Sequence, residues 1–323
     1  MLRSGIVGSE TSEPSVIQKK IQINGILPPM ITPFRENGDV DFDAFARNIE
    51  RWNATPLAGY LVLGSNSETP YLSEEEKLKL IELSVQTAAK GRTVLAGTGL
   101  ESTRETIRFT NEAARLGAHA ALVLTPSYYG SRMNDEAIIG HFSAVADASG
   151  IPILIYNVPK FTHLNISTRA VKALSRHKNI VGMKDSLGDP SQLEAFRNAV
   201  PSDFNLIVGT ASALFPALRL GIRAGILALA NCTPNACVTI QRLFEEGEHQ
   251  KAEELQGRIL PSNKAVTESF GIAGLKYAAT LMGYEGGCVR PPLLALKEED
   301  KSSLRHILTE AGFLRAHPKP NSL

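Results

Sequence analysis

The sequence predicts an α/β fold of the (β/α)8-barrel, or TIM-barrel, class with a C-terminal helical extension. Three observations lead to this prediction. Short runs rich in Val, Ile, Leu and Ala recur along the chain, stretches of helical length separate them, and most runs are apolar at consecutive positions. Strands that are apolar on both faces are typical of a parallel sheet covered by helices. An open, doubly wound sheet is the alternative.

Eight runs are candidate strands. In chain order they span 25–31, 59–63, 93–97, 120–125, 152–156, 180–184, 205–209 and 225–230. The stretches between them repeat apolar residues at spacings of three and four, as amphipathic helices do. Examples are 74–89, 103–116 and 136–148.

Capping residues support the predicted helix ends. Ser73 precedes three glutamates, and Glu105 follows the candidate N-cap Ser102 by three positions. Gly91 and Gly117 follow helical stretches, where glycine commonly ends a helix.

The chain divides into three parts by its pattern. Residues 1–20 are polar and lack the apolar core of a secretory signal, so we expect a flexible tail in a cytoplasmic protein, with a mitochondrial presequence as the alternative. Residues 21–247 hold the barrel. The pattern after Ala230 is entirely helical, over 234–246, 250–267, 274–282 and 298–311, which completes the eighth barrel helix and adds a helical extension over 248–323.

Composition excludes several classes of function. Lys and Arg number 34 against 33 Asp and Glu, and a net charge of +1 gives no field that attracts nucleic acid or a membrane surface. The three cysteines and seven histidines show no metal-ligand spacing, and no glycine-rich dinucleotide fingerprint follows the first strand. We therefore expect no catalytic metal, no dinucleotide cofactor bound in a Rossmann manner, and a small-molecule substrate.

Polar residues that end the apolar runs are the candidate site, because barrel enzymes place their chemistry at the C-terminal ends of the strands. Lys184 ends the sixth run and Tyr156 the fifth. A desolvated lysine can hold a neutral amine that attacks a ketone, and a neighbouring phenol can move protons. In isolation, Lys184 is better explained as a surface lysine at a strand end, and Tyr156 fits a core aromatic as well as a catalytic residue.

Further candidates follow other runs. Ser65 and Asn66 lie in a loop of small residues whose hydroxyl, amide and N–H donors could bind a carboxylate. An ordinary turn between strand and helix would have the same composition. Tyr128 follows the fourth run. Thr210 and Asn231 follow the last two runs and are expected to line the mouth of the pocket.

Six segments together resemble the dihydrodipicolinate synthase and N-acetylneuraminate lyase superfamily over residues 25–292. They are PPMITPF (28–34), GSNSE (64–68), LAGTGLEST (95–103), YNVP (156–159), VGMKDS (181–186) and FGIAGLK (270–276), followed by the Gly286-Gly287 pair. Within the superfamily the chain looks most like the 4-hydroxy-2-oxoglutarate aldolases.

The resemblance implies a metal-free and cofactor-free barrel, usually a homotetramer built as a dimer of dimers, that binds pyruvate. It assigns the Schiff base to Lys184 and the proton shuttle to Tyr156, 28 residues earlier. It implies that Ser65 and Asn66 bind the carboxylate of a 2-oxo acid and that Tyr128 reaches across the tight dimer. Ser186 matches a serine near the substrate in the aldolases.

Two positions depart from the dihydrodipicolinate synthases. Phe161 replaces the arginine that binds a second carboxylate there, and His163 replaces a glycine. The uncharged Phe161 counts against that activity, and because both residues lie in the segment that shapes the distal pocket, the aldolase substrate itself stays open. We therefore expect a class I aldolase, a carbon–carbon lyase that cleaves a 4-hydroxy-2-oxo acid such as 4-hydroxy-2-oxoglutarate to pyruvate and glyoxylate.

Several alternatives stay open. They are a 2-oxo-3-deoxy sugar acid aldolase or dehydratase, a sialic acid lyase, a dihydrodipicolinate synthase, and a catalytically silent barrel that only binds ligands. A phosphate-binding barrel isomerase is disfavoured, because the loops after the last two strands lack a clear phosphate cradle.

Overall fold

The computed structural model describes residues 21–315, so the tail expected over 1–20 lies outside the described residues. Its centre is one eight-stranded parallel sheet in the order β1-β8-β7-β6-β5-β4-β3-β2. The strands are β1 (Gly25–Leu27), β2 (Gly59–Val62), β3 (Thr93–Gly97), β4 (Ala120–Leu124), β5 (Ile153–Asn157), β6 (Ile180–Asp185), β7 (Asn205–Val208) and β8 (Ala224–Ile226).

Backbone hydrogen bonds between β1 and β2 close this sheet into a barrel. The Met30 N–H donates to the Leu61 carbonyl over 2.8 Å, and the Leu61 N–H donates to the Pro28 carbonyl over 3.0 Å. The predicted (β/α)8 barrel is therefore confirmed, and the open-sheet alternative is excluded.

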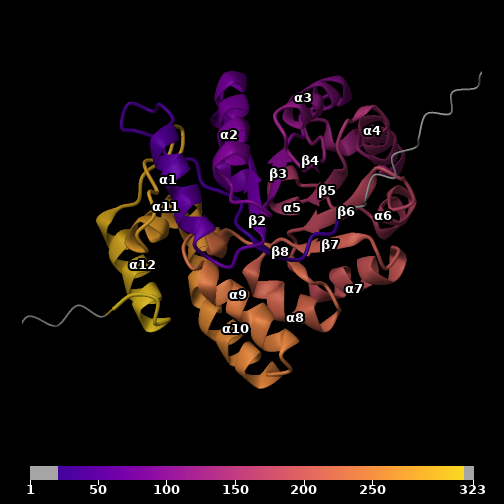
Figure 1. Cartoon of the computed structure of the whole chain (residues 1–323). Helices are drawn as coiled ribbons and strands as arrows, with labels where there is room; N and C mark the ends of the chain where they lie inside the picture. Colours follow the sequence, from indigo (N-terminus) through magenta and orange to yellow (C-terminus); the bar gives the residue numbers. More distant parts are fainter. Residues whose placement is uncertain (1–20, 316–323) are drawn as a thin grey trace, which may run out of the picture.

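Helices surround the strands, as Figure 1 shows. The barrel helices are α1 (Phe42–Asn53), α2 (Glu74–Thr87), α3 (Thr103–Arg115), α4 (Asp135–Ala148), α5 (Pro159–Thr162), α6 (Thr168–Leu174), α7 (Pro190–Ala199), α8 (Leu214–Arg219) and α9 (Pro234–Glu245). The predicted caps are confirmed. Ser73 and Glu76 form a capping box, and the Ser102 hydroxyl accepts the Glu105 N–H. Gly91 and Gly117 both have positive φ.

Two predicted strands are shorter than expected by three or more residues. The first ends at Leu27, because Pro28 and Pro29 have no N–H to donate to a neighbouring strand. The last ends at Ile226, after which the chain winds into the short 3-10 helix η5 (Ala228–Asn231).

Apolar side chains form two layers. The barrel interior holds Leu27, Leu61, Leu95, Leu122, Leu154 and Ile207, among others, and a larger layer lies between the strands and the helices. This double burial explains the continuous apolar runs of the sequence. The packed interior leaves the strand ends as the place for a site.

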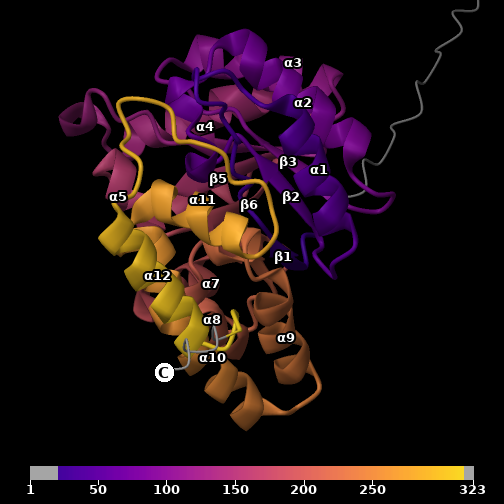
Figure 2. The same ribbon diagram turned by 90° about the vertical axis from the view of Figure 1, so that its left-hand side faces the viewer.

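The C-terminal extension begins with α10 (His249–Lys264), continues through the π-helical turn η6 (Ala265–Ser269) into α11 (Gly271–Leu281), and ends with α12 (Glu298–Glu310). Figure 2 shows the segment between α11 and α12 running across the N-terminal part of the barrel. Arg290 in this segment hydrogen-bonds the carbonyls of Gly38 and Tyr71. Among residues 21–315, no helix has the length and apolar character that crossing a membrane requires.

Candidate active site

Lys184 and Tyr156 lie opposite each other on the neighbouring strands β6 and β5, in direct register. An irregularity in this pairing determines the face of the sheet on which the Lys184 side chain lies. Ile153 pairs with Ile180 whereas Leu154 pairs with Gly182, so β6 holds one extra residue, Val181. A bulge of this kind reverses which face the following side chains occupy, and bulges recur beside active sites.

The packing on either side of β6 shows the effect of this bulge. Val181 packs in the barrel interior, and Met183 packs in the outer layer. Regular alternation from Val181 would place Met183 inside and Lys184 outside. Because of the extra residue, Lys184 instead faces the interior beside Tyr156.

The two side chains are in contact and almost fully buried. Lys184 Nζ lies 4.3 Å from the centre of the Tyr156 ring. The exposed fraction is 3% for Lys184 and 6% for Tyr156. Among residues 21–315, Lys184 forms no salt bridge with a carboxylate.

Tyr156 connects the lysine to the loop after β2. Its hydroxyl lies 3.2 Å from Ser65 Oγ. Burial by itself raises the pKa of the Tyr156 phenol, but the charge of the neighbouring Lys184 and the hydrogen bond with Ser65 outweigh it, and the net direction is a lower pKa. Ser186 acts in the same direction, although its hydroxyl falls short of hydrogen-bond geometry. A phenol of lowered pKa beside an amine is suited to proton transfer.

Ser65 and Asn66 open the 3-10 helix η1 (Ser65–Ser67), and both are partly buried. The next residue anchors the loop: Ser67 Oγ donates to the Met30 carbonyl over 2.6 Å, and the Ser67 carbonyl accepts Thr32 Oγ1 over 2.9 Å. The loop that carries the two candidate carboxylate ligands is therefore held against the chain that follows β1.

Two hydroxyls at strand ends have no hydrogen-bond partner within residues 21–315. They are Thr125 Oγ1 after β4 and Ser186 Oγ after β6, and both atoms are buried. Buried hydroxyls are normally hydrogen-bonded, so such atoms beside a candidate site are suited to a ligand. Gly209 leaves room for the second of them, because a Cβ at position 209 would lie 1.9 Å from Ser186 Oγ.

The two residues expected at the mouth differ. Thr210 is partly buried, and its hydroxyl lies 2.9 Å from Ser212 Oγ and 3.3 Å from Asn263 Nδ2. Asn231 is fully buried: its Oδ1 accepts the Ile31 N–H, and its Nδ2 donates to the carbonyls of Pro29 and Ala228. The side-chain oxygen and nitrogen of Asn231 therefore join the chain after β1 to η5, and the residue lies inside the fold and not at the mouth of the pocket, where it was expected.

Three other predicted residues lie on the surface of the single chain. Tyr128 is 79% exposed and packs edge-on against Tyr129, with ring centres 5.0 Å apart. Phe161 in α5 is 54% exposed, and His163 ends α5 with a left-handed backbone. The neighbouring Lys160 donates to the Thr267 carbonyl in η6 over 2.6 Å, which ties the distal segment to the extension.

Sequence reasoning missed the buried partner of the loop after β2. Glu68 forms an ion pair with Lys276 of α11, at 2.5 Å between Oε1 and Nζ. Each residue ends a motif of the sequence, Glu68 in GSNSE and Lys276 in FGIAGLK. A charged residue at the end of a segment of otherwise apolar or small residues is the signal that could have suggested the pair.

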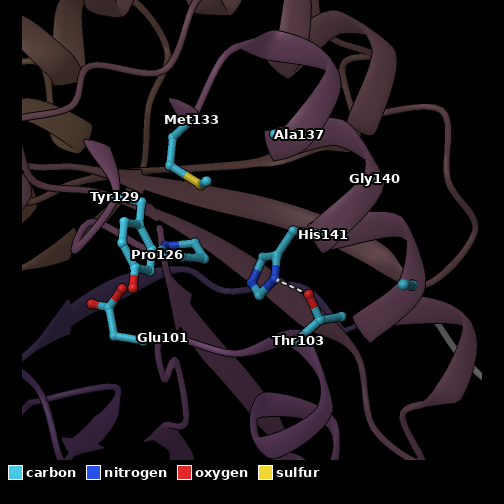
Figure 3. A pocket seen from close by; sticks show the side chains of 9 residues that line it. Glu101, Thr103, Pro126, Tyr129, Met133, Ala137, Gly140 and His141 are labelled. Atoms are coloured by element: carbon cyan, nitrogen blue, oxygen red, sulfur yellow. Dashed lines mark hydrogen bonds between the residues drawn. The ribbon is translucent and has the colours of Figure 1, made fainter. Parts of the chain in front are cut away.

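A separate cavity of about 370 Å³ lies between α3 and α4 (Figure 3). It is lined by Glu101, Thr103, Pro126, Tyr129, Met133, Ala137, Gly140, His141 and Ala144. Within it, His141 Nδ1 lies 2.9 Å from Thr103 Oγ1. No lysine lines this cavity, whereas the buried amine of Lys184 and the phenol of Tyr156 meet at the strand ends.

Known proteins similar to this chain share its barrel fold. The model of the dihydrodipicolinate synthetase family matches residues 22–311. A 4-hydroxy-tetrahydrodipicolinate synthase from Bartonella bacilliformis is 34% identical over 295 residues, which cover 91% of this chain and 99% of that protein. The crystal structure of a chloride-inhibited dihydrodipicolinate synthase from Acinetobacter baumannii, complexed with pyruvate, is similar with a TM-score of 0.86 and 29% identity, covering 91% of this chain and all of that one.

Proposed function

The chain belongs to the dihydrodipicolinate synthetase family, and from that premise we propose that it is a pyruvate-dependent class I aldolase that forms a Schiff base on Lys184. We further propose that its reaction is the cleavage of 4-hydroxy-2-oxoglutarate to pyruvate and glyoxylate. The observation that carries the Schiff-base proposal is the buried contact of Lys184 with Tyr156, at 4.3 Å from nitrogen to ring centre.

The first half of the reaction builds the covalent intermediate. The neutral amine of Lys184 attacks C2 of the 2-oxo acid, and the proton that the nitrogen then loses is transferred to the carbonyl oxygen to give a carbinolamine. Tyr156 then supplies the proton with which the hydroxyl leaves as water, and the nitrogen lone pair forms the C=N bond of the iminium. The hydrogen bond between Tyr156 and Ser65 supports this role, because it orients the phenol for proton transfer.

The second half uses the iminium as an electron sink. A base takes the proton of the C4 hydroxyl, the C3–C4 bond breaks, and its electrons form an enamine while C4 leaves as an aldehyde. Tyr156 is the proposed base, aided by Tyr128 of a neighbouring chain or by the substrate's own carboxylate. Protonation at C3 and addition of water to C2 release pyruvate and regenerate Lys184.

Ser65 and Asn66 are the proposed ligands of the C1 carboxylate, so that C2 meets the amine at reacting distance. Two observations support this role: the contact of Ser65 with Tyr156, and the anchoring of η1 by Ser67. The unpartnered Ser186 hydroxyl is the proposed contact for the distal part of the substrate, with Thr210 beside it.

The identity of the second substrate depends on the distal segment. The similar proteins from Bartonella bacilliformis and Acinetobacter baumannii are named as a 4-hydroxy-tetrahydrodipicolinate synthase and a dihydrodipicolinate synthase, respectively. Condensation of pyruvate with aspartate semialdehyde is therefore the second candidate function. Phe161 favours the aldolase, because an uncharged ring offers no ion pair to the semialdehyde carboxylate. Sugar acid aldolases and sialic acid lyases use the same iminium and differ only in the aldehyde released.

The exposed tyrosines support an assembly of several chains. Tyr128 and Tyr129 are 79% and 71% exposed in the single chain, and large exposed aromatics next to each other commonly mark an interface. We propose a homotetramer built as a dimer of dimers, in which Tyr128 completes a neighbour's site. Multi-angle light scattering measures the assembly, and a monomer with full activity would contradict it.

The test of the proposed function is borohydride trapping with pyruvate, followed by peptide mapping. We expect a stable adduct on Lys184 and none in Lys184→Ala. Mapping is needed because Lys276 is also buried and its pKa is lowered to about 8, first of all by burial. An adduct on Lys276 would refute the assignment to Lys184, and no adduct at all would leave a silent binding protein as the better description.

A substrate panel separates the aldolases. Purified enzyme is given pyruvate with glyoxylate, with glyceraldehyde or with aspartate semialdehyde, and in the reverse direction 4-hydroxy-2-oxoglutarate. We expect the highest kcat/KM for 4-hydroxy-2-oxoglutarate and glyoxylate. Consumption of the semialdehyde alone would assign the chain to dihydrodipicolinate synthesis instead.

A further inference from the structure

Two charged side chains that the proposed reaction does not use are buried next to the carboxylate-binding loop. Glu68 directly follows η1, and Lys276 lies in α11 of the C-terminal extension. Their side chains are 0% and 2% exposed, and Lys276 Nζ lies 2.5 Å from Glu68 Oε1. A buried ion pair contributes little net stability, because desolvation of both charges offsets their attraction. A role beyond stability is therefore worth seeking.

Groups of the C-terminal extension occupy both oxygens of the Glu68 carboxylate. Lys276 takes Oε1, and the backbone N–H of Arg290 donates to Oε2 over 2.8 Å. Lys276 in turn donates to the carbonyl of Cys288. The carboxylate therefore joins the loop after β2 to two separate parts of the extension.

Side-chain contacts of Arg290 fix the far side of this junction. Its guanidinium forms two hydrogen bonds with Glu76 of α2, at 2.7 and 2.8 Å. The ring of Phe34 lies against both cations, 4.4 Å from Lys276 Nζ and 4.2 Å from the Arg290 guanidinium carbon. The extension is thus held to the barrel on both sides of Glu68.

The backbone of the loop needs such an anchor. Leu63 and Glu68, which bracket the segment 64–67, have φ values of 59° and 54°. Residues other than glycine rarely adopt this left-handed backbone conformation, and where they do, contacts with the surrounding structure hold them in it. At Glu68 the surroundings are the groups of the extension that hold its side chain.

We propose that the Glu68–Lys276 pair is the positioning device of the carboxylate-binding loop, through which the C-terminal extension orients Ser65 and Asn66 toward the C1 carboxylate of the 2-oxo acid. The inference rests on the proposed function, which makes this loop the carboxylate site. Neither residue touches the substrate. Small displacements of substrate-positioning groups reduce rates strongly, so a shift of η1 is expected to weaken the recognition of the carboxylate.

The experiment compares two ketones in the borohydride assay on the full-length chain. Pyruvate carries the C1 carboxylate, and hydroxyacetone lacks it. The first variant is Glu68→Gln, which keeps the size of the side chain and its acceptor for the Arg290 N–H. We expect the half-saturating pyruvate concentration for trapping on Lys184 to rise at least tenfold, whereas the trapping rate with hydroxyacetone changes less than twofold.

The matched control is Glu285→Gln. It removes the ion pair of Glu285 with Arg47, which joins the same extension to α1 without touching the loop. We expect this variant to trap pyruvate like the wild type. If Glu285→Gln raised the half-saturating pyruvate concentration as much as Glu68→Gln did, the effect would be a general loosening of the extension and the proposal would be wrong.

A second variant covers the case in which a single substitution unfolds the protein. Glu68→Gln combined with Lys276→Met removes both charges, so no unpaired ion stays buried, and circular dichroism checks its fold. The same pyruvate-specific loss is expected. Equal losses for both ketones, or an unchanged pyruvate requirement, would overturn the inference. Failure of the wild type to trap pyruvate on Lys184 would instead overturn the proposed function, so the two failures are distinguishable.

Discussion

Lys184 and Tyr156 face each other across the β5–β6 pairing, and the amine lies against the phenol ring at 4.3 Å from its centre. The hydroxyl of the same ring lies 3.2 Å from Ser65. One tyrosine thus contacts both the candidate nucleophile and the candidate carboxylate loop. This arrangement allows the two roles of the phenol, in proton transfer and in holding the lysine, to be separated by substitution.

Tyr156→Phe keeps the ring beside Lys184 and removes the hydroxyl. We expect kcat for retro-aldol cleavage to fall by about 10²- to 10⁴-fold, which is typical for the loss of a general acid–base group. Steady-state kinetics with 4-hydroxy-2-oxoglutarate measures the change, and slow borohydride trapping on Lys184 should persist.

The control for this substitution is Tyr60→Phe. The Tyr60 hydroxyl lies 2.7 Å from Asn53 Oδ1, so its removal also costs one hydrogen bond, about 1 kcal/mol, outside the site. We expect normal turnover in Tyr60→Phe. A Tyr156→Phe enzyme within threefold of wild-type kcat would contradict the proton relay.

Phe161→Arg tests the assignment of the distal segment. A guanidinium pairs with a carboxylate through two parallel hydrogen bonds, which a phenyl ring cannot do. We expect kcat/KM for aspartate semialdehyde to rise at least tenfold, while Phe161→Leu leaves it unchanged. Because Phe161 is 54% exposed, neither substitution should lower the melting temperature by more than a few degrees. A wild-type enzyme that already prefers the semialdehyde would remove the basis of this prediction.

The sequence predicted the fold closely because each βα unit carries its own local pattern. The third strand was predicted at its observed bounds, 93–97, and the caps at Ser73 and Ser102 were correct. Placing Lys184 and Tyr156 on adjacent strand ends also followed from local runs. Their direct pairing could be expected because parallel strand ends meet at one rim.

Long-range features could not be predicted in this way. The bulge at Val181 depends on how β6 pairs with β5, and its local signal is a glycine within the strand, Gly182, which by itself does not show which way Lys184 points. Glu68 and Lys276 are 208 positions apart, so no local pattern joins them. Asn231 was placed on the pocket wall because it follows the last strand, but packing of η5 buries it completely.

His141→Asn tests the buried histidine of α4. Burial lowers the pKa of His141 to about 4, although Glu101 opposes the shift, whereas an unfolded histidine titrates near 6.5. Between these values the unfolded chain binds the extra proton, so the free energy of unfolding falls as the pH is lowered from 6.5 to 4. The loss attributable to this group is at most about 3 kcal/mol.

Urea unfolding at several pH values measures this dependence. The asparagine variant lacks the titrating group but keeps an acceptor for Thr103, so its stability should fall less steeply below pH 6.5. Identical slopes for the variant and the wild type would show that His141 does not govern acid stability.

Two glycine substitutions with opposite expected signs test the space around the site. A Cβ at Gly209 would lie 1.9 Å from Ser186 Oγ and 2.7 Å from the Asp185 carbonyl, so Gly209→Ala must displace β6 immediately after Lys184. We expect a loss of about 1–3 kcal/mol in urea unfolding, as for other overpacked sites, and at least a tenfold loss of kcat. Gly257 lies within α10, and among residues 21–315 no side chain or other backbone segment would lie within 4 Å of a methyl group added to its Cα. Gly257→Ala should therefore stabilise the protein by about 0.5–1 kcal/mol and leave turnover unchanged, because alanine restricts the unfolded chain and favours the helix. An active, stable Gly209→Ala enzyme would show that the end of β6 can move without consequence for Lys184.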